Sequence, residues 1–84
     1  MNVKVKFTGL LTSLDGEYYL APGMSFIDLM KRILGHKYSF IFDESGRLQS
    51  FLALFHNNEW ISNINSIHLS DGDQFVFMTA QSGG

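Results

Sequence analysis

Apolar and polar side chains alternate from residue 2 to residue 7, and three apolar ones share a face: Val3, Val5 and Phe7. Alternation with a period of two is typical of a strand that buries one side. Asp15-Gly16 is a hairpin turn signal, so residues 17–21 are expected to form a second strand paired with the first. The chain therefore opens with a predicted β-hairpin.

A helix is expected after Pro22-Gly23, which ends the second strand. Ser25 is a good N-cap, and Asp28 three residues later resembles the second half of a capping box. The apolar positions that follow have the spacing of a buried helical face: Phe26, Leu29, Met30 and Ile33. Gly35 has the character of the residue that ends a helix. The pattern thus predicts one main helix.

The second half of the chain predicts more strands. Residues 38–42 are short and apolar, and residues 51–55 are a strong strand with apolar side chains on both faces. Asn57-Asn58 is expected to form a tight turn, because asparagine tolerates positive φ better than most residues. Residues 59–61 would return as a short strand, and residues 74–78 form the last one.

Together these elements predict a single α+β domain over residues 1–79, with one helix across a mixed sheet of four to five strands. The last strand would lie parallel to the first. Residues 80–84 are small and polar and are expected to form a flexible tail. Glycine has no Cβ to hinder close approach, so the carboxylate of Gly84 is the candidate reactive group.

Composition excludes several classes of function. The 84 residues carry a net charge of −2 and no cysteine, so a basic face for nucleic acid and a cysteine metal site are not expected. No apolar run approaches the roughly 18 to 20 residues of a membrane span, and a cytoplasmic protein is expected. The histidines lack the spacing of metal ligands: His36, His56 and His68. No catalytic triad or phosphate-binding loop is present in the sequence.

Three segments resemble a known family in their order and spacing. They are residues 42–48, followed by the strand 51–55; residues 69–77; and Ser82-Gly83-Gly84 at the end. The set resembles the ubiquitin-like β-grasp sulfur carriers, most closely the small subunit of molybdopterin synthase and less closely the sulfur carrier of thiamin biosynthesis. Two positions depart from that pattern, since Thr79-Ala80 stands where the family commonly has prolines and Asn58 where it has glycine.

The resemblance implies a carrier with no catalytic residues of its own and no bound cofactor. An E1-like adenylating enzyme would use ATP to adenylate the carboxylate of Gly84. Sulfur would then displace AMP and leave a thiocarboxylate, which a large synthase subunit or another acceptor enzyme would use. Gly83 and Gly84 would let the backbone pass through a narrow channel, and Ser82 precedes them in the tail.

The family's packing would place Phe75 and Phe77 under the helix and leave the alternate side chains facing outward. Exposed apolar patches mark interfaces, so the hypothesis is a docking surface for both enzymes made of four residues: Phe51, Phe55, Val76 and Met78. The alternative is that residues 38–50 cover this face, or that the register is inverted and these residues are core.

Other functions remain open on the sequence alone. Gly84 could be conjugated to lysines of target proteins, as in a ubiquitin-like modifier. The protein could instead supply sulfur for thiamin or another pathway, although the length and residues 42–48 favour molybdopterin. A plain interaction module with an incidental Gly-Gly end is a third possibility, because the same scaffold hosts unrelated roles.

Overall fold

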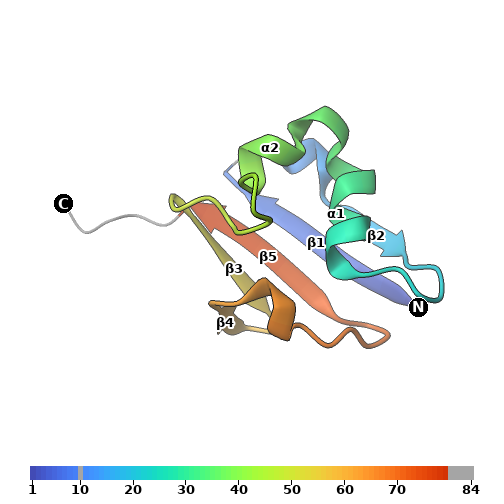
Figure 1. Ribbon diagram of the computed structural model, residues 1–84. Helices are drawn as coiled ribbons and strands as arrows, with labels where there is room; N and C mark the ends of the chain where they lie inside the picture. Colours follow the sequence, from blue (N-terminus) through green and yellow to red (C-terminus); the bar gives the residue numbers. More distant parts are fainter. Residues whose placement is uncertain (10, 80–84) are drawn as a thin grey trace.

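The computed structural model describes residues 1–9 and 11–79. It contains five strands: β1 (Asn2–Thr8), β2 (Gly16–Tyr19), β3 (Leu52–His56), β4 (Glu59–Ile61) and β5 (Gln74–Thr79). The helical elements are α1 (Phe26–Leu34), α2 (Tyr38–Ile41) and three short 3-10 turns at Thr12–Leu14, Gly35–Lys37 and Ile64–Ser66. Figure 1 shows the helices together on one side of the sheet.

All five strands form one mixed sheet in the order β2-β1-β5-β3-β4. The central pair, β1 and β5, is parallel, and Val5 lies opposite Phe75 in it. Every other neighbouring pair is antiparallel, with Leu54 of β3 opposite Phe77 of β5. The predicted parallel pairing of the first and last strands is confirmed, and so is the α+β β-grasp fold with its helix across a mixed sheet.

The predicted helix start is confirmed by the hydrogen bonds between Ser25 and Asp28. The Ser25 hydroxyl oxygen accepts a hydrogen bond from the Asp28 N–H at 3.1 Å, and the Asp28 carboxylate accepts one from the Ser25 N–H at 3.2 Å. These reciprocal bonds satisfy two backbone donors that a helix otherwise leaves without partners. Helix α1 ends at Gly35, whose φ of 55° is readily adopted by glycine.

The chain stays helical beyond Gly35, which the sequence does not predict. A 3-10 turn leads into α2, so the apolar segment 38–42 forms a helical turn before Phe42 bridges to Leu48. A short apolar run does not distinguish a strand from a buried helical turn. The Tyr38 and Phe42 rings, four residues apart, stack at 5.0 Å, which is the spacing that a helix brings together.

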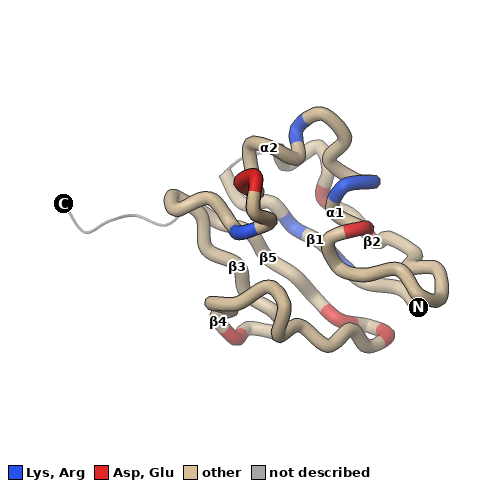
Figure 2. The backbone as a smooth tube through the Cα atoms, in the orientation of Figure 1, with Lys and Arg blue, Asp and Glu red and all other residues tan. Residues whose placement is uncertain are grey.

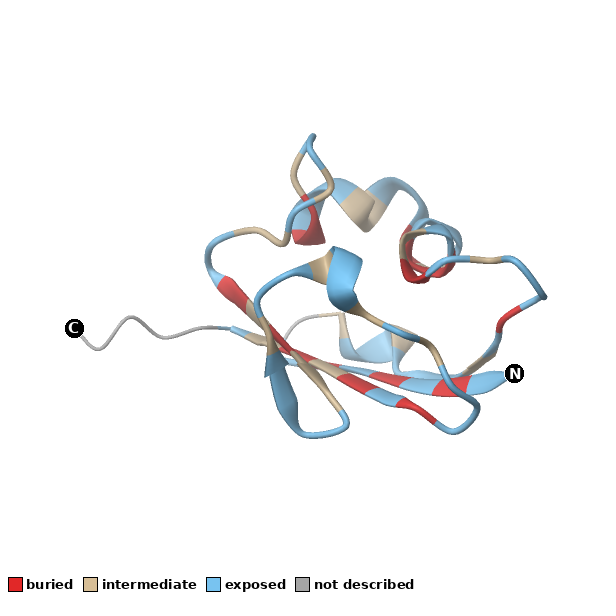
Figure 3. Ribbon diagram, turned by 60° about the horizontal axis from the view of Figure 1, so that its bottom comes forward, coloured by how far each residue is buried: buried red, intermediate tan, exposed pale blue. Residues whose placement is uncertain are grey.

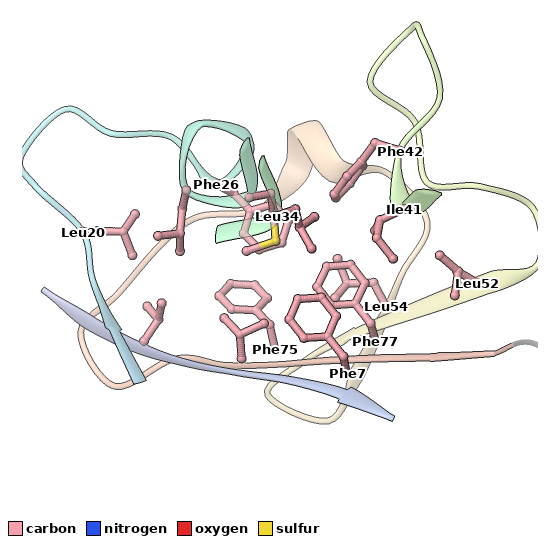
Figure 4. Packing of buried hydrophobic residues seen from close by; sticks show 14 residues of the cluster. Phe7, Leu20, Phe26, Leu34, Ile41, Phe42, Leu52, Leu54, Phe75 and Phe77 are labelled. Atoms are coloured by element: carbon pink, nitrogen blue, oxygen red, sulfur yellow. The ribbon is translucent and has the colours of Figure 1, made fainter. Parts of the chain in front are cut away.

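Aromatic rings fill the space between the sheet and the helices (Figure 4). The rings of Phe7 and Phe77 stack at 5.1 Å, and those of Phe26 and Phe75 lie 4.6 Å apart. Phe42 meets Phe77 edge to face at 6.1 Å. Such pairs add to the free energy of apolar burial. Figure 3 shows buried residues alternating with less buried ones along β1 and β5, as the sequence pattern predicts.

The buried carboxylate of Asp73 links the turn between β3 and β4 to the start of β5. Asp73 is only 6% exposed and accepts hydrogen bonds from the Asn57 side-chain amide at 3.0 Å and the Ser70 N–H at 2.8 Å. His56 Nε2 lies 2.9 Å from its second oxygen. The Asn57 amide oxygen in turn accepts the Gln74 N–H at 2.8 Å. Burial raises the pKa of Asp73, but the hydrogen bonds from Asn57 and Ser70 and the nearby His56 imidazole outweigh burial, so the pKa is lowered.

This network predicts an acid-sensitive contribution to stability. Because the pKa of Asp73 is lowered in the folded protein, its contribution is complete above the unfolded-state pKa of about 3.9 and is lost as the pH falls below it. The substitution Asp73→Asn leaves one donor without an acceptor and should lower the free energy of unfolding at pH 7 by about 1–3 kcal/mol.

Urea unfolding followed by circular dichroism between pH 3 and pH 7 measures both effects. The difference between wild type and Asp73→Asn should shrink toward pH 3. Exposed Glu44, for which no side-chain bond is seen in the described part of the chain, provides the control Glu44→Gln. A constant difference at all pH values would contradict an ionised Asp73 as the source.

Candidate functional site

The structure describes only one of the two predicted parts of the site, the docking surface, because the tail lies outside the described residues. Gly84, Gly83 and Ser82 lie outside the described residues. The last described residue is Thr79, which ends β5 opposite Leu52 of β3. Because β5 lies between β1 and β3, the chain enters the segment 80–84 from the end of a central strand.

The predicted outward side chains lie together across β3 and β5. Phe55 is directly opposite Val76, and Ala53 is directly opposite Met78. All four are partly exposed, whereas the side chains that alternate with them are buried in the core: Leu52, Leu54, Phe75 and Phe77. The predicted register is therefore correct, and the inverted register is wrong.

Residues 38–50 do not cover this face. Ile41 and Phe42 are 1% exposed and belong to the core between the sheet and the helices, and α2 lies on the same side of the sheet as α1 (Figure 1). Phe51 is 48% exposed, but it precedes β3 and so stands just outside the paired strands. Three of the four predicted docking residues thus form a contiguous surface, and Phe51 lies at its border.

The outward surface also contains an aromatic residue to which the sequence pattern assigns no role. Trp60 is 65% exposed and lies opposite Phe55 in the pairing of β3 with β4. The signal was present in the sequence, because a two-residue turn at Asn57-Asn58 places residues 55 and 60 opposite each other. Both asparagines have the expected positive φ, 50° and 71°. We call the resulting set the outward patch: Ala53, Phe55, Trp60, Val76 and Met78.

A depression lies on the helix side, between the loop 43–50 and the segment that follows β4. Its volume is about 1090 Å³, and both Lys31 and Glu44 border it. The neighbouring Asp43 accepts hydrogen bonds from the Ser45 hydroxyl at 2.7 Å and the Arg47 N–H at 3.0 Å, which lower its pKa. Asp43 therefore closes its own loop, and it does not form an acid–base pair with Glu44.

The residues that the structure describes contain neither a candidate metal site nor a membrane-spanning helix. No group of three or more histidine, aspartate or glutamate side chains is placed there to hold a metal ion. Over the same residues, no helix is long and apolar enough to cross a bilayer. The outward patch is consequently the feature of the described surface that most needs a functional explanation.

Comparison with known proteins identifies the fold. No protein-family model and no curated protein matches the sequence. Among solved structures, the chain is similar to SAMP1 from Haloferax volcanii, with a TM-score of 0.72, 16% sequence identity and coverage of 100% of both chains. At this identity the likeness shows a common β-grasp fold and leaves the function to be argued from the site.

The alternation along β3 and β5 predicts opposite outcomes for neighbouring substitutions. Phe55→Asp/Met78→Asp places charges on the solvent side and should cost about 1–2 kcal/mol through lost strand propensity and partial burial. Leu54→Asp/Phe77→Asp places them in the core, where a lost phenylalanine alone costs about 3–5 kcal/mol and an unpaired charge costs more. Thermal melts and gel filtration should show a folded monomer for the first pair and an unfolded chain for the second. Unfolding of both pairs would show that the outward patch is core.

Proposed function

We propose that the protein is a sulfur carrier that presents the carboxylate of Gly84 to partner enzymes. An E1-like adenylating enzyme would activate the carboxylate with ATP, and a large synthase subunit would take up the sulfur for molybdopterin. The observation that carries this proposal is that one strand, β5, contributes both Val76 and Met78 to the outward patch and leads into residues 80–84. The β-grasp fold and the ordered motifs of the sequence support it.

The reach of the chain from the patch limits where a partner can act. Gly84 follows Met78 by six residues, and six extended residues span at most about 20 Å. An enzyme that covers the outward patch would therefore need its active site within that distance of Met78. Docking on a rigid sheet would then place the carboxylate in the active site without any further contact with the domain.

The proposed chemistry requires no catalytic group from the carrier itself. A carboxylate is a poor electrophile, so one of its oxygens would first attack the α-phosphorus of ATP, releasing pyrophosphate and forming an acyl adenylate. A hydrosulfide ion supplied at the partner's active site would then attack the carbonyl carbon and expel AMP, which leaves the thiocarboxylate at Gly84. The carrier would supply only an unhindered acyl group, for which glycine is suited because it lacks a Cβ.

Mass spectrometry of the intact protein tests this function. Co-expressed with the E1-like adenylating enzyme of the same genome, the wild-type protein should gain the mass difference between sulfur and oxygen at Gly84, and should form an adenylate when sulfur is withheld. The unmodified mass establishes first whether Gly84 carries the free carboxylate. Deletion of Gly84 and the folded variant Phe55→Asp/Met78→Asp should each lower the yield at least about tenfold, the latter through lost docking.

Other results would assign another role. If no adenylate forms and oxygen is never exchanged for sulfur, the protein is no sulfur carrier. An adenylate without sulfur exchange, accompanied by isopeptide linkage of Gly84 to lysines of cellular proteins, would instead identify a ubiquitin-like modifier. If deletion of Gly83-Gly84 leaves the function intact, the protein is a plain interaction module.

A further inference from the structure

Met78 provides the sulfur atom of the outward patch, on a strand that carries no charge. It lies opposite Thr8 of β1 on one side and Ala53 of β3 on the other. Both neighbours have short side chains, so neither reaches over the long side chain of methionine. β3 and β5 contain no Lys, Arg, Asp or Glu, and Figure 2 shows both strands in tan. The thioether of Met78 therefore lies in an uncharged and partly exposed region of the sheet surface.

The other methionines stand in different surroundings. Met30 is 0% exposed and belongs to the core cluster, and Met24 packs against that cluster. Met78 is partly exposed and lies outside the cluster. Met1 is also exposed, but it precedes β1, at the end of that strand opposite to Thr8. The 84 residues contain no cysteine, so the thioether of Met78 is the oxidisable sulfur of the outward patch.

Oxidation of this thioether converts a flexible apolar side chain into a polar, chiral sulfoxide. With hydrogen peroxide as the oxidant, a sulfur lone pair attacks one peroxide oxygen, and the S–O bond forms as the O–O bond breaks. The hydroxide that leaves takes up the remaining proton and departs as water. Sulfur loses two electrons, which reduce the peroxide. Because the side chain points away from the core and β5 pairs through its backbone, the fold should accept the added oxygen.

We propose that Met78 is an oxidation site at which peroxide reversibly weakens docking on the outward patch, a consequence that rests on the proposed function. A partner that covers the patch would have to strip water from the sulfoxide oxygen, and burial of a polar group without a hydrogen bond costs free energy. The reduced thioether carries no such cost. Methionine sulfoxide reductases restore the thioether, so the carrier would return to its partner enzymes once reduced.

Peptide mapping by mass spectrometry tests the site itself. The purified protein is exposed to hydrogen peroxide for increasing times, freed of peroxide, unfolded and digested. Met78 should gain the mass of one oxygen atom at least about tenfold faster than Met30, because an oxidant reaches Met30 only when the core opens. A thermal melt of the oxidised protein should show the folded state that the untreated protein has.

Calorimetric titration with the purified E1-like adenylating enzyme tests the effect on docking. Each protein is freed of peroxide before it meets the enzyme and is compared with its own untreated sample. Oxidation should lower the affinity of the wild-type protein at least about tenfold, and reductases for both sulfoxide epimers should restore it. Met78→Leu, which has a similar volume but no sulfur, should show no loss on treatment. Met24→Leu, the matched control, should lose affinity on treatment as the wild type does.

Equal rates of oxidation at Met78 and Met30 would overturn the oxidation site. Unchanged affinity after oxidation, or a loss that Met78→Leu shares, would overturn the effect on docking and leave the proposed function standing. Unfolding of the oxidised protein would also overturn the proposal, since the sulfoxide would then act on the fold. If the untreated wild-type protein neither binds the enzyme nor is adenylated, the proposed function fails and takes the effect on docking with it, while peptide mapping still decides the oxidation site.

Discussion

The parallel pairing of β1 with β5 is the constraint on which the rest of the molecule depends. It joins segments about seventy residues apart, and it sets Phe7 beside Phe77 on the helix side and Lys6 beside Val76 on the other. It also makes β5 a central strand, so the segment that leads to Gly84 leaves from the most firmly paired part of the sheet. A parallel pair needs a long crossover connection, and α1 with α2 provides the helical part of it.

Because successive side chains of a strand face opposite ways, β3 and β5 build the core and the outward patch at once. A slip of one residue would bury Val76 and Met78 and expose Phe75 and Phe77. The hydrogen bonds around Asp73 oppose such a slip, since they join the turn after β3 to the first residue of β5. The buried polar network thus protects the surface pattern as well as the fold.

The sequence was sufficient where local chemistry decides the structure. The alternation in β1, the capping box at Ser25 and the turn at Asn57-Asn58 follow from side-chain periodicity and backbone preference, and all three are confirmed. The α2 turn was not predictable, because a short apolar run suits a strand or a helix and tertiary packing decides between them. The buried network of Asp73 was not predictable either, since its partners come together only when β3 and β5 pair.

The proposed function would separate recognition from reaction, because the outward patch would dock the partner and the end of the chain would react. The proposed reactive group is a bare carboxylate with little to distinguish it from any other chain end, so selectivity has to come from elsewhere. A partner held on the patch confines that carboxylate to a radius of about 20 Å around Met78, which raises its effective concentration to about the millimolar range. The sheet has a fixed register, so the outward patch would present its side chains to a partner in one fixed arrangement. Under this proposal, selectivity would reside in the outward patch, while the small residues at the end of the chain would enter an active site.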